Sequence, residues 1–201
     1  MEKKPGDLVI AADAGIRLAE RLGMEPDLTV GDFDSLGFVP QKGEVIRHPV
    51  RKDDTDSMLA ARLGLARGYR RFAFYGCYGA RPDHTFANIQ TLAFVAERGG
   101  FATMCCGNFT AAVFKDGAIS FPADTEGHFS VFSLTEEAEG VTVAGGLYEA
   151  EQEHLRYDFP LGQSNAFCGK EVRISVRRGT LLVIWQGGED RVRFPSDSVE
   201  K

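Results

Sequence analysis

Aspartates recur directly after apolar runs in the first half of this 201-residue sequence. In the stretch LTVGDFDSL, residues 28–36, a short apolar run ends in a glycine, and two carboxylates follow two residues apart. Because like charges at this spacing repel, a site built from them needs a positive partner. Mg²⁺ suits that role, since it prefers oxygen ligands and often shares its shell with substrate phosphates. The aspartates placed in this way are Asp13, Asp32, Asp34, Asp53, Asp54, Asp56 and Asp83.

The same segments also carry positive and hydrogen-bonding groups, namely Lys52, Arg81, His84 and Asn88. Arginine is suited to binding phosphate in a bidentate manner. A phosphoryl-transfer site needs carboxylates that bind a metal ion and cationic side chains that bind phosphate, and both kinds of group occur here. Each of these residues taken alone also fits an ordinary turn residue, helix cap or surface cation. Their recurrence after several predicted strands favours the functional interpretation.

The elements that would position these groups alternate along the first half of the chain. Short apolar runs predict buried strands at residues 8–12, 28–30, 44–48, 72–76 and 101–105. Helical segments are predicted between several of them, at residues 14–23, 57–68 and 83–100, with Thr55 or Asp56 as the cap of the second. Such alternation favours a mostly parallel, Rossmann-like sheet flanked by helices in three layers. The aspartates would then follow the strands at one carboxyl edge of the sheet, which is where open α/β sheets bind ligands.

The pattern changes after about residue 108. Strand-like segments separated by turns such as KDG and RRGT follow, and EVRISV shows the alternation of a half-buried strand. We therefore predict an α/β catalytic domain over residues 1–112, which carries the predicted metal and phosphate site. An all-β C-terminal part, a β-sandwich, is predicted over residues 113–201.

Composition narrows the classes of function. The net charge of −6 and the pI of about 5.3 argue against a nucleic-acid partner. No apolar run approaches the ~20 residues that span a bilayer, so no membrane association is predicted. The four cysteines include no C-x-x-C pair, which argues against a zinc site. Without a disulfide pattern or a signal peptide, the sequence predicts a cytoplasmic protein.

Several segments resemble, in order, the motifs of the thiamine pyrophosphokinases (thiamine diphosphokinases). AADAGIRLAERLGMEPDLTVGDFDSL is similar to the block A-D-G-G…P-D…G-D-F-D-S, and KDDTDSMLA is similar to K-D-x-T-D. GCYGARPDHTFANIQTL resembles G-x-x-G-x-R-x-D-H-x-x-A-N. In the β part, GGLYEA followed by LGQSNAF resembles G-L-x-Y-x-L…G-x-S-N, a weaker match.

This resemblance implies an activity and a set of roles. The family transfers a diphosphoryl group from ATP to thiamine, giving thiamine diphosphate and AMP, and it uses Mg²⁺. It also implies an α/β domain followed by a β-sandwich, and a homodimer with sites between subunits. The metal would be held by Asp32, Asp34 and Asp56, which with Arg81 and Asp83 form the implied catalytic set. ATP would be bound by Asp13, Lys52, Asp53, Thr55, His84 and Asn88, and thiamine by Tyr148, Ser164 and Asn165.

The sequence also departs from the family pattern at one place, and two other functions remain as alternatives. The family begins with one more strand and a glycine-containing turn, whereas only MEKKPGD precedes LVIAADAG here. Either the chain is truncated, or its start codon is assigned late, or this member lacks that first strand. A catalytically impaired thiamine or nucleotide binder is therefore one alternative. A metal-dependent phosphoesterase is another, although Leu36 and Thr85 stand where such enzymes prefer other residues. From the sequence, Tyr148 also fits an ordinary strand aromatic.

Overall fold

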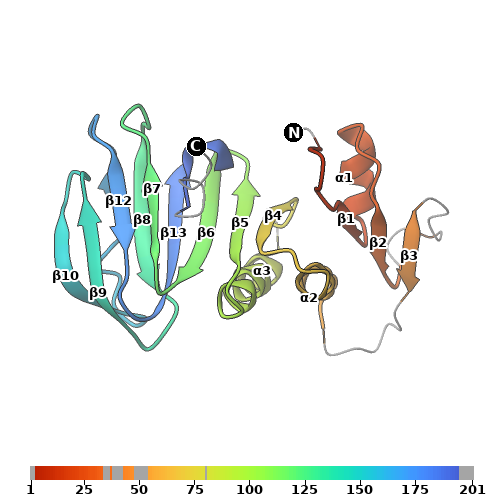
Figure 1. The fold of residues 1–201 in the computed structure, drawn as a ribbon, viewed down its shortest axis with the longest axis horizontal. Helices are drawn as coiled ribbons and strands as arrows, with labels where there is room; N and C mark the ends of the chain where they lie inside the picture. Colours follow the sequence, from red (N-terminus) through yellow and green to blue (C-terminus); the bar gives the residue numbers. More distant parts are fainter. Residues whose placement is uncertain (1–2, 34–36, 38–42, 48–53, 80, 195–201) are drawn as a thin grey trace. The chain divides into compact units, whose positions relative to one another are not determined.

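The structure, a computed structural model, describes residues 3–33, 37, 43–47, 54–79 and 81–194. The chain divides into two compact units, Met1–Tyr69 and Arg70–Lys201 (Figure 1). Helices and strands alternate through the first half, and strands dominate the second. The prediction that the chain has a mixed α/β fold is thus confirmed.

The first unit is a small parallel sheet with two helices. Its strands are β1 (Ile10–Ala12), β2 (Leu28–Gly31) and β3 (Glu44–Arg47), in the order β1-β2-β3. Both pairings are parallel, and Ala12 lies opposite Val30. The helices are α1 (Gly15–Arg21) and α2 (Asp56–Ala66). Leu59 of α2 packs against Leu28 and Val30, so α2 covers this sheet.

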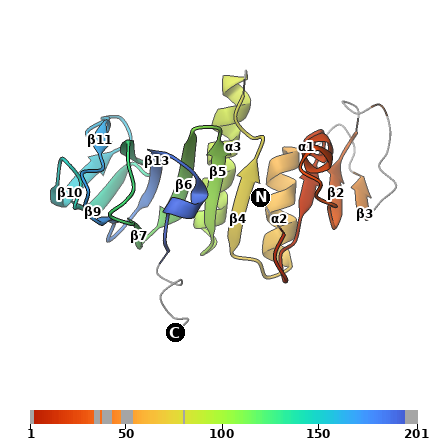
Figure 2. The same cartoon turned by 90° about the horizontal axis from the view of Figure 1, so that it is seen from above.

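The second unit contains a six-stranded sheet in the order β11-β8-β13-β6-β5-β4. Its strands are β4 (Arg71–Tyr75), β5 (Phe101–Cys106), β6 (Phe109–Lys115), β8 (His128–Ser133), β11 (Asn165–Ala166) and β13 (Thr180–Gln186). Only β4 and β5 pair in parallel, and the other pairings are antiparallel. Helix α3 (Pro82–Ala96) packs against β5 and β6 (Figure 2).

A second sheet in this unit has the order β10-β9-β12-β7. Its strands are β7 (Ala118–Phe121), β9 (Glu137–Ala144), β10 (Ala150–Arg156) and β12 (Val172–Ser175). Side chains from both sheets share one core, in which the Phe121 and Trp185 rings meet edge to face at 5.1 Å. Val172 and Ile174 are buried while Arg173 between them is exposed, as expected for a sandwich strand.

The single Rossmann-like sheet is not confirmed in that form. Among the described residues the parallel strands belong to two sheets, and the first contains only three of them. Gly107 and Asn108 form a two-residue connection that folds β5 and β6 into a hairpin with Cys106 opposite Phe109, and this hairpin joins the parallel pair β4–β5 to the antiparallel strands. The six-stranded sheet therefore runs through residue 112. The boundary predicted there, between a catalytic and a thiamine-binding part, stays a prediction.

Helix α3 is fastened to the sandwich at its C-terminal end. Glu97 accepts a hydrogen bond from Lys115 Nζ of β6 at 2.5 Å and one from Thr180 Oγ1 of β13 at 2.7 Å. The Lys115 contact lowers the pKa of Glu97 below its ordinary value of 4.5. A single carboxylate thus joins α3 to two strands of the six-stranded sheet.

Replacing Glu97 with glutamine should lower the free energy of unfolding at neutral pH. Because the pKa of Glu97 is depressed in the folded state, its contribution is present above pH 4.5 and is lost as the pH falls through the folded-state pKa. Urea unfolding at a series of pH values should therefore give wild-type and variant curves that converge in acid. Glu151→Gln, on the exposed surface of β10, is the control and should follow the wild type. A constant difference at every pH would contradict this account.

Within the described part of the chain, no helix has both the length and the apolar character needed to cross a membrane.

Candidate active site

Asp13 and Asp32 lie at the same edge of the first sheet. Asp13 follows the last residue of β1, and Asp32 follows the last residue of β2. The two strands are parallel, and the backbone N–H of Asp13 donates to the carbonyl of Val30 at 2.8 Å. Both aspartates therefore stand at the carboxyl edge of the sheet, as the sequence predicts.

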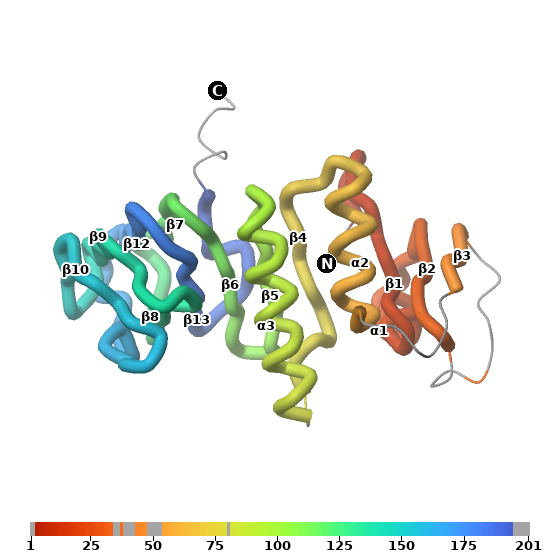
Figure 3. Tube along the Cα trace, turned by 90° about the horizontal axis from the view of Figure 1, so that it is seen from below, coloured from red at the N-terminus to blue at the C-terminus, as the bar shows by residue number. Residues whose placement is uncertain are grey.

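Helix α2 brings Asp56 to this edge as well. Arg67, just after α2, pairs with Glu44 at the start of β3 at 3.0 Å. The Tyr69 hydroxyl donates to the carbonyl of Gly6, upstream of β1, at 3.1 Å. The C-terminal end of α2 thus lies at the amino edge of the strands, and the helix runs opposite to β1 (Figure 3). The helix has eleven residues and rises about 1.5 Å per residue, so its first turn, which contains Asp56, reaches the carboxyl edge of the strands.

Thr55 acts as the N-cap of α2. Its Oγ1 accepts a hydrogen bond from the backbone N–H of Met58 at 3.2 Å, and its backbone is extended. This satisfies one of the otherwise unpaired N–H groups of the first turn. The predicted cap is confirmed, whereas contact of Thr55 with ATP stays a prediction.

Other predicted residues of this edge fall outside the described residues, namely Asp34, Lys52 and Asp53. Among the residues that are described, no group of three or more His, Cys, Asp or Glu side chains is arranged to hold a metal ion. The predicted ligand set includes Asp34, so its geometry as a set is not tested.

Gly31 allows the two acidic segments to approach each other. It has φ +153°, and a Cβ placed on it would lie 3.2 Å from Asp13 Cα and 3.3 Å from Asp13 N. Asp13 and Phe33 have left-handed backbones, with φ +44° and +61°. Such conformations persist only where the surroundings enforce them, and they concentrate at functional sites. Gly31 was absent from the predicted site residues, although a glycine at a strand end before an acid pair is a readable signal.

Replacing Gly31 with alanine should lower kcat about tenfold, because the new methyl group displaces Asp13 relative to Asp32. Steady-state kinetics measures this effect. Gly15→Ala is the matched control, since a Cβ at Gly15 meets no atom within 4 Å and alanine favours its helix. Equal kcat values for the two variants would show that the close approach at Gly31 has no catalytic importance.

In the second unit, Arg81 and Asp83 form a bidentate pair at the start of α3. Arg81 Nη2 lies 2.5 Å from Asp83 Oδ2, and Nε donates to Oδ1 at 3.3 Å. The guanidinium holds the pKa of Asp83 below its ordinary value of 3.8. Both side chains are about two-thirds exposed, and His84 beside them is exposed too. These groups remain accessible to a ligand at the helix N-terminus.

Asn88 has a clear structural partner. Its side chain is buried, 8% exposed, and its Nδ2 donates to the carbonyl of Cys77 at 2.7 Å. This hydrogen bond holds the segment that follows β4 against helix α3. Asn88 thus holds the segment that leads to Arg81, and its predicted contact with ATP is not tested.

The three residues predicted to bind thiamine lie together. Asn165 Oδ1 accepts from the Tyr148 N–H at 3.0 Å, and its Nδ2 donates to the Tyr148 carbonyl at 2.6 Å. Ser164, next to Asn165, has a left-handed backbone with φ +65°, and its side chain is exposed. Tyr148 lies outside the strands and is 66% exposed, so it is not a buried strand aromatic. Asn165 orients the Tyr148 segment, and Tyr148 remains available to a ligand.

Two family models match the sequence. "Thiamin pyrophosphokinase, catalytic domain" matches residues 3–100, and "Thiamin pyrophosphokinase, vitamin B1 binding domain" matches residues 118–181. Together they cover most of the chain. No curated protein sequence matches it.

Several solved structures share the fold. A thiamine pyrophosphokinase from Bacillus subtilis is 22% identical with a TM-score of 0.81, over 92% of this chain and 90% of that chain. A thiamin pyrophosphokinase family protein from Enterococcus faecalis is 24% identical with a TM-score of 0.76, over 94% and 93%. The Candida albicans thiamin pyrophosphokinase is 16% identical with a TM-score of 0.71, over 90% and 81%.

Proposed function

Since the chain belongs to the thiamin pyrophosphokinase family, we propose that it transfers the diphosphoryl group of ATP to thiamine, giving thiamine diphosphate and AMP. The observation that carries this proposal is the position of Asp13, Asp32 and Asp56 at one carboxyl edge. Like charges collected at one edge are costly unless a cation and a polyphosphate use them. ATP is the co-substrate of this family.

Mg²⁺ fits the chemistry of these donors, since all are hard carboxylate oxygens. In this proposal Asp32, Asp34 and Asp56 hold the ion, with Asp13 and Asp53 beside it. The ion, when bound, offsets charge on the phosphate oxygens and orients the polyphosphate. Lys52 and Thr55 lie near the nucleotide in the same proposal.

The reaction itself is an in-line displacement. The hydroxyl of thiamine attacks the β-phosphorus of ATP, and AMP leaves with the electrons of the broken P–O bond. Arg81 stabilises charge on the transferred oxygens, and Asp83 holds the guanidinium in its bidentate orientation. His84 and Asn88 complete the nucleotide side. A carboxylate of the site accepts the proton of the hydroxyl.

The thiamine side is proposed to involve Tyr148, Ser164 and Asn165. The exposed ring of Tyr148 suits a cationic thiazolium or a pyrimidine face. Because the family resemblance implies sites between subunits, we also propose a homodimer. Five large apolar side chains within residues 147–161 support it, each more than half exposed: Leu147, Tyr148, Tyr157, Phe159 and Leu161. Sedimentation velocity tests the dimer directly.

The proposal places the enzyme in the cytoplasm. The four cysteines are all free thiols, as a reducing compartment would maintain them.

One assay tests the function against its rivals. The protein is incubated with ATP and Mg²⁺, with and without thiamine, and the nucleotide products are separated. AMP formed only with thiamine supports the transferase. Phosphate released without thiamine identifies a phosphoesterase, and binding without turnover identifies a non-catalytic binder.

A further inference from the structure

The segment 187–194, here called the C-terminal strap, runs across the sheet after β13. The Thr110 hydroxyl of β6 donates to the Gly187 carbonyl at 2.7 Å, and Trp185 Nε1 donates to the Gly188 carbonyl at 3.1 Å. At the far end of the strap, the Phe194 ring lies 4.5 Å from that of Phe101 of β5. The strap is therefore attached to the sheet on both sides of Glu189.

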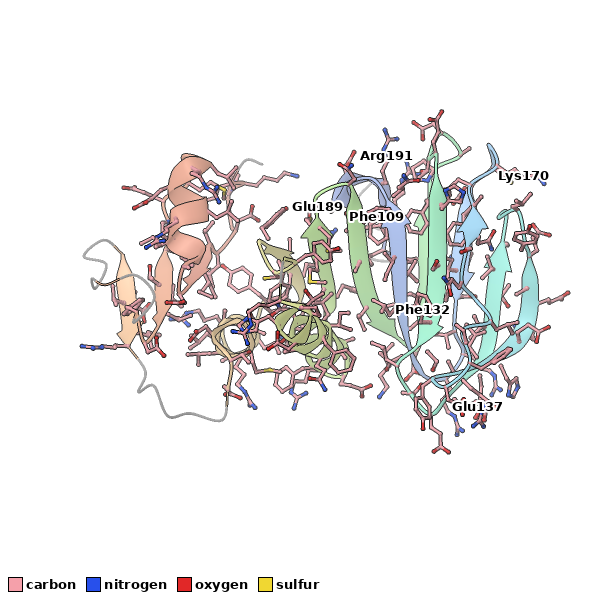
Figure 4. All side chains as sticks on the ribbon, turned by 180° about the vertical axis from the view of Figure 1, so that it is seen from behind. Phe109, Phe132, Glu137, Lys170, Glu189 and Arg191 are labelled. Atoms are coloured by element: carbon pink, nitrogen blue, oxygen red, sulfur yellow. The ribbon has the colours of Figure 1, made fainter. Side chains whose placement is uncertain are left out.

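Glu189 accepts hydrogen bonds from two strands of the sheet. The Tyr75 hydroxyl of β4 donates to Glu189 Oε1, and the Thr103 hydroxyl of β5 donates to Oε2 at 3.3 Å. Figure 4 shows Glu189 among the side chains of this part of the sheet. Burial and the Glu189 carboxylate raise the pKa of Tyr75, and burial raises the pKa of the neighbouring Cys105 thiol to about 12. Tyr75 is thus a neutral donor at physiological pH.

Tyr75 is the last residue of β4, so its position sets where the next segment begins. Residues 76–79 follow β4, and Arg81 stands directly before the first residue of α3. Asn88 holds the segment after β4 at the Cys77 carbonyl, two residues after Tyr75. The segment therefore has two anchors close together, one from α3 and one from the strap.

We propose that Glu189 is a positioning residue for nucleotide binding, which acts through the Tyr75 hydroxyl on the segment that carries Arg81. The inference rests on the proposed function, because it assigns ATP to that segment. No motif of the sequence points to Glu189, which is 114 residues from Tyr75. Glu189 itself does not touch the substrate in this account.

The test compares Glu189→Ala, Glu189→Gln and Tyr75→Phe. Glu189→Ala and Tyr75→Phe should each raise the KM for ATP about tenfold and also lower kcat, with the KM for thiamine unchanged, because only the segment that carries Arg81 loses an anchor. The double variant should be no worse than either single variant, since both remove the same bond. Glu189→Gln keeps an oxygen that can accept from Tyr75 and should stay near the wild type.

Two controls separate positioning from loss of fold. Asp190→Asn removes a negative charge from the adjacent, exposed position of the strap and should leave the KM for ATP unchanged. Trp185 is the only tryptophan and bonds to the strap, so its fluorescence reports detachment. Its emission should be the same in the wild type and in Glu189→Ala.

Calorimetric titration of each protein with ATP and Mg²⁺ keeps the two proposals distinguishable. If the wild type binds ATP but forms no AMP with thiamine, the proposed activity fails, and a tenfold loss of affinity in Glu189→Ala still supports the inference. A wild-type affinity and KM for ATP in Glu189→Ala would overturn it. An equal rise in both KM values with altered Trp185 emission would also overturn it, since Glu189 would then only hold the fold. Absence of ATP binding by the wild type would overturn both.

Discussion

Replacing Asp32 with asparagine is expected to lower kcat about a thousandfold, because a neutral amide cannot supply the charge that binds Mg²⁺ and the polyphosphate. Asp32 leaves the carboxyl end of β2, beside Asp13 and on the same edge as Asp56. The variant should unfold at the same temperature as the wild type or higher in the absence of Mg²⁺, since it removes one of several like charges. Single-turnover formation of AMP and thermal melting measure the two effects.

Asp27 provides the matched control on the same strand. It directly precedes β2, whereas Asp32 directly follows it. Asp27 accepts hydrogen bonds from Lys3 Nζ at 2.6 Å and from the Val9 N–H at 2.8 Å, so its role is structural. Asp27→Asn should therefore lower the melting temperature and leave kcat unchanged. If both variants lost activity equally, the position of Asp32 at the carboxyl edge would not explain its effect.

The same experiment tests the metal. Addition of EDTA should reduce AMP formation to the background rate, and an excess of Mg²⁺ should restore it. The Asp32→Asn variant should need more Mg²⁺ for half-maximal activity than the wild type. Full activity in EDTA would contradict the assignment of Asp32, Asp34 and Asp56 as metal ligands.

The second large effect is expected at Arg81. Arg81→Ala should lower kcat about a hundredfold through loss of a charged donor to the transferred group, and Arg81→Lys should recover only part of the activity. Because Arg81 holds the pKa of Asp83 down, its removal lets that pKa rise. If Asp83 acts in its ionised form, the acid limb of the pH–activity profile should move to higher pH in Arg81→Ala. Rates measured over a pH series test both statements.

Arg156 offers a control with the same local geometry. It pairs with Asp158 two residues later through Nε and Nη2, each at 3.0 Å, as Arg81 pairs with Asp83. Both pairs are largely exposed. Arg156→Ala should keep wild-type kcat and KM values and the wild-type sedimentation profile. A similar loss of activity in both variants would mean that an exposed Arg–Asp turn matters in general and that Arg81 has no special role.

Much of the candidate site could be read from the sequence. The pattern of an apolar run, a glycine and an acid is contained within about ten residues, so the local order of residues was enough to assign Asp13 and Asp32 to strand ends. The position of Asp56 at the same edge required the direction of α2, which the contacts of Arg67 and Tyr69 establish. The structure shows that Asn88 and Asn165 each donate to a backbone carbonyl, contacts that no motif indicated, and their ligand contacts stay predictions.

The order of residues was sufficient to locate the acids, the arginine and the alternation of strands and helices, because each of these depends on neighbours along the chain. It was insufficient for sheet membership, since β5 pairs in parallel with β4 and antiparallel with β6, which places β4 and β5 in the sheet of the sandwich strands and not in the sheet of β1–β3. Nor could it reveal how closely a side chain at Gly31 would approach Asp13, or the contact between Glu189 and Tyr75. Those features join segments that are distant in sequence, and they exist only once the chain has packed.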